Sequence, residues 1–269
     1  MINIKLEQFK TDLNKLFEKL NYSKNIFITC DLNKFGKFNL KKKDKVESLY
    51  LSLKSNVSKD STIFVPTPTL NLCNTNIPFD LHNTKSHNAS ALAEYIRTKK
   101  DSIRSMHPFW SVSGIGENAK ILKNISKHAY GMGSIWGKFL DIDTTQINFC
   151  KHPSKAVTLI HHIETIVGVP YRYTKEFNHP ILLNNKIKLE NYYLSVIYKN
   201  SDILKKIKLN EHFFDELEKK DKLKYFKSDL GFEVWSFRMR DFYNIALDFF
   251  NQNIYTYLEF EPNQKPFRK

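Results

Sequence analysis

The sequence predicts an α/β fold in which a central sheet is flanked by helices. Along the first third of the chain, apolar residues at helical spacing alternate with short apolar runs of strand length, which is typical of α/β proteins. The chain has 269 residues, 41% hydrophobic and 14% aromatic, so it can bury one substantial core. No internal repeat or Gly/Ser-rich linker divides it. We therefore expect one domain over residues 1–269, with a core over about 1–180 and a C-terminal appendage over about 181–269.

The N-terminal elements follow in order. Residues 6–20 repeat apolar side chains every three or four positions, which predicts an amphipathic helix. Residues 25–30 and 62–65 are apolar runs that predict buried strands, and the prolines after residue 65 end the second strand. A further helix is expected between these strands, over residues 45–53.

The rest of the chain continues the alternation. Residues 69–85 are rich in Asn, Pro and Thr and predict a loop at the end of a strand, where α/β proteins usually place ligand contacts. A helix over residues 88–99, capped by Asn88 or Ser90, precedes the blocks discussed below. The remaining predicted elements are a strand over 146–150, a helix over 154–167, a strand over 191–198, and helices over 210–222 and 237–250.

Charge, hydropathy and cysteine content disfavour several classes of protein. The net charge of +14 indicates either a solvated lysine-rich surface or attraction for an anionic partner. The basic runs are short and flanked by acids, and an RNP-like aromatic pattern is missing, which disfavours nucleic acid. No apolar run approaches the length of a bilayer span, and the first residues have no apolar signal core, so we expect no membrane span and a cytoplasmic location. The three cysteines are widely spaced without a CxxC pair, which argues against a disulfide framework or a zinc site.

Three short blocks carry the candidate chemistry. Residues 103–116 and 130–136 contain glycines and hydroxyl residues, and turns of this kind suit a phosphate-bearing ligand, although they also occur as plain turns packed in a core. In residues 158–173, His161 and Glu164 stand three positions apart on a predicted helix, so they share one face. Such a pair is either a general base with its carboxylate or a surface ion pair. A metal site from His161, His162 and Glu164 is disfavoured because adjacent helix positions point about 100° apart, and we expect no metal.

The order and spacing of several segments add to this interpretation. VPTPT, SHNASALAEYIR, RSMHPFWSVSGIG, YGMGS and TLIHHIE…VPYRY resemble the aminoglycoside 3-N-acetyltransferase-like (antibiotic N-acetyltransferase) family over about residues 27–177. The ending VPYRYTKEF is similar to the branch that N-acylates amino sugars carried on nucleotides. The resemblance implies a central mixed sheet flanked by helices, acetyl-CoA or another acyl-CoA as donor, and an amine as acceptor.

The resemblance also implies roles for individual residues. His161 matches the general base, Glu164 its partner, and Thr67 a catalytic position in the turn beside the thioester. The positions expected to bind the coenzyme are Pro66, Thr69, Ser86, Arg104, Ser105, His107, Ser111, Gly131, Gly133 and Ser134. The positions expected on the substrate side, to which the C-terminal appendage contributes, are Asp31, Asp80, Tyr171 and Arg172.

The sequence departs from the family pattern at four places. Thr29-Cys30 stands where His-Ser is common, Ser90 replaces the usual Gly, and His128-Ala129-Tyr130 replaces Asp/Ser-x-Phe. Residues 150–156 lack the Asp that often precedes the histidine, so an Asp–His–Glu relay is in doubt and Glu164 would orient the ring by itself.

The predicted function is an acyl-CoA-dependent N-acyltransferase, in the first instance an N-acetyltransferase, with direct transfer and His161 as base. A charge of +14 suits two anionic ligands, so a nucleotide-linked amino sugar is the predicted acceptor. One alternative is an aminoglycoside 3-N-acetyltransferase that confers antibiotic resistance, and another is a basic binding protein without catalysis. The oxyanion is expected to bind the turn at residues 67–69 or backbone N–H groups near Ser111. The oligomeric state stays open.

Overall fold

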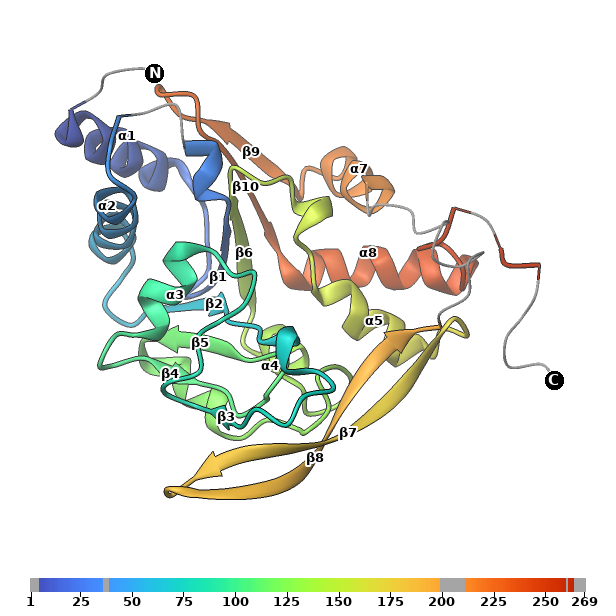
Figure 1. The fold of residues 1–269 in the computed structure, drawn as a ribbon. Coiled ribbons are helices and arrows are strands. Elements are labelled where there is room, and N and C mark those ends of the chain that lie inside the picture. Colours follow the sequence, from blue (N-terminus) through green and yellow to red (C-terminus); the bar gives the residue numbers. More distant parts are fainter. Residues whose placement is uncertain (1–4, 36–38, 199–210, 260, 264–269) are drawn as a thin grey trace.

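The computed structural model describes residues 5–35, 39–198, 211–259 and 261–263. Within these ranges the main sheet has seven strands in the order β4-β5-β2-β1-β6-β10-β9. Strand β1 is parallel to β2 and β6, whereas the other neighbours are antiparallel. The sheet is therefore mixed, and helices lie on both sides of it (Figure 1). The predicted fold class is confirmed.

The strands of the main sheet are β1 (Asn25–Cys30), β2 (Thr62–Pro66), β4 (Ile103–Arg104), β5 (Val112–Ile115), β6 (Thr144–Phe149), β9 (Lys224–Lys227) and β10 (Glu233–Arg238). A smaller sheet contains β3 (Phe79–Asp80), β7 (Arg172–Leu183) and β8 (Lys186–Ile197). The α-helices are α1 (Leu6–Lys19), α2 (Lys42–Asn56), α3 (Ala91–Arg97), α4 (Ile135–Asp141), α5 (Leu159–Val167), α7 (Glu211–Lys219) and α8 (Met239–Gln252). Short 3-10 turns are η1 (Leu32–Phe35), η2 (Leu70–Leu72), η3 (Glu117–Lys123) and η4 (Pro153–Lys155).

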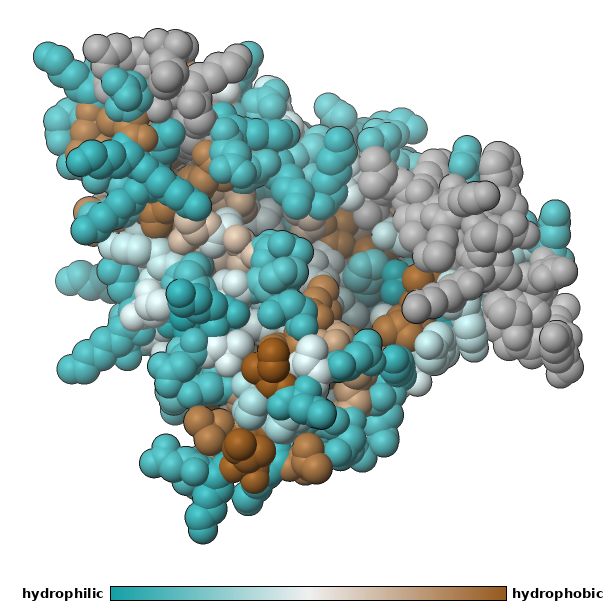
Figure 2. All heavy atoms as spheres, in the orientation of Figure 1, coloured by the Kyte–Doolittle hydropathy of each residue, from teal (hydrophilic) through white to brown (hydrophobic). Residues whose placement is uncertain are grey.

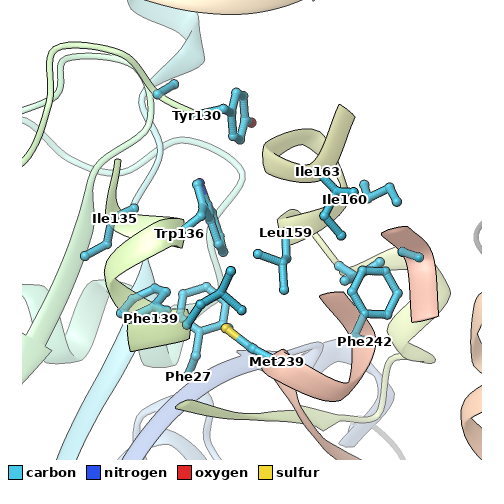
Figure 3. Close-up of a cluster of buried hydrophobic side chains, with 14 of the residues drawn as sticks. Phe27, Tyr130, Ile135, Trp136, Phe139, Leu159, Ile160, Ile163, Met239 and Phe242 are labelled. Carbon is cyan, nitrogen blue, oxygen red and sulfur yellow. The ribbon is translucent and has the colours of Figure 1, made fainter. Parts of the chain in front are cut away.

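Each face of the main sheet has its own apolar core, because successive strand residues point to opposite faces. Ile26 and Ile28 of β1 pack with buried side chains of α1, α2 and α3. Phe27, between them, belongs to the cluster on the other face, which α4, α5 and α8 complete. Figure 3 shows Trp136 of α4 and Met239 of α8 near Phe27. This second core fixes α5, the helix that carries His161.

The predicted elements are largely present, with differences that have physical causes. The cap of α3 is Ser90, whose Oγ accepts from Ala93 N at 3.1 Å. The helix expected from residue 154 begins only at Leu159, because Pro153 opens a 3-10 turn that His152 caps through Ser154 N. Phe237 lies in β10 rather than in the following helix. The start expected for a helix at residue 210 lies outside the described residues.

The C-terminal part of the chain is built into the main sheet. β10 pairs with β6 along residues 234–238, and β9 extends the sheet beyond it. Phe213 and Phe242 belong to the same apolar cluster as Phe27. The boundary expected near residue 180 therefore does not divide the sheet, and residues after it share a core with residues before it.

A long hairpin of β7 and β8 is predicted from the sequence only in part, by the strand expected over residues 191–198. β7 and β8 pair over twelve residues each, from Arg172↔Ile197 at the base to Leu183↔Lys186 at the tip. Ile187 and Leu189 near the tip are 62% and 66% exposed, and Figure 2 shows hydrophobic residues along the lower edge of an otherwise mostly hydrophilic face. No helix in the described ranges is long and apolar enough to cross a bilayer.

Candidate active site

A carboxylate, an imidazole and a guanidinium meet where α5 ends and β7 begins. His161 Nδ1 and Arg172 Nε each lie 2.7 Å from the same oxygen of Glu164, Oε2. The chain turns back at Gly168, which ends α5 in the left-handed conformation with φ 69°. This backbone conformation favours glycine. This turn brings the first residue of β7 onto the last turns of α5.

The three side chains differ in how deeply they are buried. Glu164 is fully buried, Arg172 is 11% exposed, and His161 is 24% exposed. Burial alone would raise the pKa of Glu164, but its hydrogen bond to His161 and the charge of Arg172 lower it. Burial likewise opposes the charge of Arg172, and Glu164 raises the pKa of the guanidinium. Glu164 is therefore an ionised carboxylate inside the protein.

This geometry selects one tautomer of His161. An ionised carboxylate only accepts hydrogen bonds and a guanidinium only donates them, and both lie near Nδ1, with Arg172 Nη2 at 3.0 Å. The shorter contact to an ionised acceptor is the stronger one, so we assign the proton to Nδ1. The lone pair is then on Nε2, which makes no hydrogen bond to a described residue. Tyr130 and Tyr257 approach the ring edge-on, with centroids at 5.6 and 6.0 Å.

His162 supports the glycine turn that the sequence singled out. Its Nδ1 lies 3.2 Å from both Gly131 N and Ser134 Oγ, and burial lowers its pKa to about 4. Gly131 and Gly133 have φ of 86° and 71°, a region that favours glycine. The sequence suggests no role for His162 beyond a disfavoured metal ligand. The available sign of its supporting role is its position next to His161, because adjacent helix residues point about 100° apart and His162 therefore faces a different neighbour. The described residues contain no cluster of three metal-ligating side chains.

A second group of predicted residues forms a buried network at the end of β2. Arg104 Nε donates to Ser111 Oγ at 2.9 Å, and Nη2 donates to the carbonyl of Thr67 at 3.0 Å. Ser111 Oγ donates to the same carbonyl at 2.6 Å. The Thr67 hydroxyl lies 3.3 Å from that of Ser111 and 3.2 Å from that of Ser113. Thr67 and Ser111 are fully buried, so their hydroxyls are engaged within the protein.

The loop between β4 and β5 is held by its own polar side chains. Ser105 Oγ accepts from Val112 N at 2.9 Å. His107 Nδ1 accepts from Trp110 N at 3.1 Å, and burial lowers the pKa of this ring to about 4. Both residues are fully buried, as is Thr69, whose hydroxyl donates to the Pro108 carbonyl. These residues shape the loop, and their contact with a coenzyme stays a prediction.

The remaining predicted positions lie in separate parts of the fold. Ser86 Oγ donates to Glu94 at 2.6 Å, and Pro66 ends β2 opposite Val112. The carboxylate of Asp80 accepts from backbone N–H groups of its own loop. Tyr171 is buried, and burial and the nearby Glu164 carboxylate raise the pKa of its hydroxyl. Asp31 is partly exposed after β1 and accepts from Asn33 N at 3.2 Å.

The structure thus brings together His161, Glu164, Tyr171 and Arg172 as one cluster, and Thr67, Arg104 and Ser111 as another. No hydrogen bond between described residues joins the two clusters. Arg172 was predicted on the substrate side, and its contact with Glu164 gives it an additional place in the cluster around the imidazole.

Lowering the pH from 7 to 5.5 is expected to reduce the free energy of unfolding by at least about 2 kcal/mol, about 1 kcal/mol for each of two buried rings. His107 and His162 have a pKa of about 4 in the folded protein and an ordinary value near 6.5 when unfolded. The unfolded chain therefore binds protons first as pH falls, so stability is full above pH ~6.5 and declines toward pH ~4. Urea unfolding at both pH values measures the change.

The variant His162→Leu is the control for this prediction. It removes one titrating ring, so its decline between the two pH values should be smaller by about 1 kcal/mol. Burial also lowers the pKa of His152 and His179, which contribute in the same direction. A decline that His162→Leu leaves unchanged would contradict the assignment.

Comparison with known proteins supplies the family. The sequence profile of the aminoglycoside 3-N-acetyltransferase family matches residues 27–251, whereas no curated protein matches the chain. Among solved structures, aminoglycoside acetyltransferase AAC(3)-Xa superposes with a TM-score of 0.76 at 13% identity, covering 93% of each chain. AAC-IIIb in its binary complex with CoASH gives 0.74 at 15% identity, covering 93% of this chain and 97% of that one.

AAC-VIa bound to sisomicin gives a TM-score of 0.71 at 15% identity, covering 93% of this chain and 98% of that one. At these identities the structural likeness shows a shared fold. The profile match extends over most of the sequence, and it includes both clusters described above. The chain belongs to the aminoglycoside 3-N-acetyltransferase family.

Proposed function

We propose that this protein transfers the acetyl group of acetyl-CoA to an amino group of an aminoglycoside, with His161 as general base. The family is one of acetyl-CoA-dependent N-acetyltransferases, and two proteins of the same fold carry CoASH and sisomicin in their structures. The observation that carries the proposal is the 2.7 Å contact between His161 Nδ1 and the buried Glu164 carboxylate, because it leaves Nε2 free to accept a proton.

Each residue of the cluster has a separate role in the proposed reaction. His161 Nε2 takes a proton from the amine as its nitrogen attacks the thioester carbonyl carbon. The carbon–sulfur bond then breaks, and the coenzyme leaves as a thiolate that takes the proton from the imidazolium. Glu164 stabilises that imidazolium, and Arg172 keeps Glu164 ionised and fixed in position. A general base of this kind contributes about 10²–10⁴-fold to the rate.

The donor is expected to lie along the turn at residues 131–134. Met132 is 88% exposed and Gly133 is also exposed, whereas the N–H groups of Gly131 and Ser134 donate within the protein. The middle of the turn is therefore the part open to a phosphate-bearing ligand.

The predicted oxyanion donors are the turn at residues 67–69 or backbone N–H groups near Ser111, and the hydroxyl of Thr67 is one candidate in that turn. This hydroxyl would have to leave Ser111 and Ser113 to reach the tetrahedral oxygen, so backbone N–H groups are the alternative donors.

A nucleotide-linked amino sugar is the second candidate acceptor. The net charge of +14 supports it, because a strongly basic protein attracts anionic substrates and repels polycationic ones. The names of the structural neighbours support the aminoglycoside instead, since sisomicin is bound in AAC-VIa.

Thiol release from acetyl-CoA, measured with separate panels of aminoglycosides, nucleotide-linked amino sugars and simple amines, tests the proposal. Turnover with aminoglycosides above the simple amines supports the first candidate. Turnover confined to nucleotide-linked sugars would replace it with the second. A well-folded protein that binds CoA and acetylates no amine would overturn both.

A further inference from the structure

The free end of the β7–β8 hairpin presents an exposed sheet edge. β8 is the last strand of the smaller sheet, and on its open side the described residues supply an isolated bridge from His128 to Tyr193 and no further strand. Figure 1 shows the tip of the hairpin projecting beyond the rest of the fold. An edge strand of this kind offers its unpaired backbone groups to another strand.

The hydrogen bonds of Tyr193 show which backbone groups of β8 face this edge. Tyr193 N donates to the carbonyl of Lys127 at 3.0 Å, and the carbonyl of Tyr193 accepts from Ala129 N at 2.9 Å. Both backbone groups of Tyr193 therefore point away from β7. In an antiparallel ladder this direction recurs at every second residue, so the N–H and carbonyl groups of Ile187 and Leu189 also face the open edge.

The same two residues carry apolar side chains that the chain leaves uncovered. Ile187 and Leu189 are 62% and 66% exposed, and residues two apart on a strand lie on one face. The turn before them is tight, because Asn184 and Asn185, with φ of 50° and 60°, make the two-residue connection typical of type I′ hairpins. Backbone groups and apolar side chains are thus presented together on a strand that is already formed.

The side chains of this strand are complementary to those of a second copy. When two β8 strands pair antiparallel about a two-fold axis at Lys188, Ile187 lies opposite the partner's Leu189. Lys186 then lies opposite the partner's Glu190, and the symmetry makes each contact occur twice. Apolar pairs and opposite charges at facing positions stabilise a sheet. Within residues 186–190, Lys188 alone meets a like charge, that of its own counterpart.

The two charged side chains are available for these contacts. Lys186 is exposed and forms no ion pair with a described residue. Glu190 pairs with Lys127 at 2.8 Å, and its side chain is still 27% exposed. A carboxylate accepts several hydrogen bonds, so a lysine of a second copy can share it.

An anionic membrane surface is the other candidate for an apolar edge that carries lysines. It fits these residues less well, because lipid supplies no strand that would satisfy the backbone groups of Ile187 and Leu189. The carboxylate of Glu190, in the same row as the lysines, would also be repelled by anionic headgroups.

We propose that two copies of this chain associate through residues 186–190 of β8, which pair antiparallel about a two-fold axis at Lys188. The smaller sheet then continues from one copy into the other, a form of strand addition. The paired segment is short, so we expect a weak dimer with a Kd of about 1–100 μM. The proposal rests on the hairpin and does not depend on acetyl transfer.

Sedimentation equilibrium of the full chain, over a concentration series up to about 500 μM, tests the proposal. The double variant Ile187→Lys/Leu189→Lys is expected to weaken association at least about tenfold, since it replaces both apolar side chains with like charges. The matched control is Leu51→Lys, because Leu51 is 51% exposed on α2, and it is expected to leave association unchanged.

Exchange of charge tests the register of the pairing. Lys186→Glu creates like charges at both contacts between positions 186 and 190, and so does Glu190→Lys. Each variant alone is therefore expected to associate about tenfold more weakly than the wild type. An equimolar mixture of the two variants has opposite charges at both contacts, so heterodimers are expected to form with a Kd within about threefold of the wild type.

Four results would overturn the proposal. The first is a wild-type protein that stays monomeric throughout the series, and the second is undiminished association of the Ile187→Lys/Leu189→Lys variant. The third is a mixture of the charge variants that associates no better than either alone. The fourth is binding to vesicles of phosphatidylserine and phosphatidylcholine without self-association, which would assign the edge to a membrane. Circular dichroism shows that each variant is folded.

Discussion

His161→Ala is expected to lower kcat for acetyl transfer by about 10²–10⁴-fold, the usual contribution of a general base. The ring is the only side chain of its cluster that combines partial exposure with a free basic nitrogen, because Glu164 is fully buried and Arg172 cannot accept a proton. Steady-state kinetics with acetyl-CoA and a good acceptor measure the loss. The Kd of CoA should stay within about twofold, since the base contributes to the transition state rather than to donor binding.

His128→Ala is the matched control for this variant. His128 is exposed and stacks on Tyr193 at 4.3 Å, and it makes no hydrogen bond to His161, Glu164 or Arg172, so its removal should leave kcat nearly unchanged. Full turnover by His161→Ala would show that another group takes the proton.

Arg172→Met is expected to lower the free energy of unfolding by about 3–5 kcal/mol, the usual cost of removing one partner from a buried ion pair. The variant leaves the carboxylate of Glu164 fully buried and without its guanidinium. Since the pKa of Glu164 is held below its ordinary value in the folded protein, this stabilisation is present above pH ~4.3 and is lost as pH falls through the lower folded value. Chemical denaturation at neutral pH measures the effect.

A second replacement distinguishes the effect of the unpaired charge on stability from the effect of lost packing. Arg172→Met combined with Glu164→Gln removes the unpaired charge, so the double variant should recover part of the lost stability. Arg238→Met is a matched control, because Arg238 pairs with Asp143 at the surface and should cost less than about 1 kcal/mol. A loss in Arg172→Met no larger than in this control would show that the ion pair is energetically unimportant.

The sequence predicted three neighbouring strands of the main sheet, β1, β2 and β6, because they are buried on both faces. β1 and β2 are short apolar runs, and such runs stand out against the polar loops that flank them. Of the hairpin β7–β8, only the strand over residues 191–198 was predicted. β7 was missed because most of its first half is exposed and polar, so residues 172–176 carry little apolar pattern. β10 was missed at Phe237 because one aromatic run continues from this strand into α8.

The candidate site, too, was predicted from the sequence only in part. Helical spacing alone predicted that His161 and Glu164 share one face, and the structure has them in contact at 2.7 Å. Their contact with Arg172 depends on the turn at Gly168 and on the direction of β7, which local spacing cannot supply. Likewise, the burial of Thr67 and His107 follows from how the loops pack on the sheet, so the motif identified the residues without giving their accessibility.

The position of Arg172 at the first pair of the β7–β8 ladder has a consequence for divergence within the family. The twelve paired rows place the tip, at Leu183 and Lys186, far along the strands from the ion pair. Insertions, deletions or substitutions at that tip leave the rows next to Arg172 intact. The distal arm is thus free to diversify while the contact between Arg172 and Glu164 at its root is preserved.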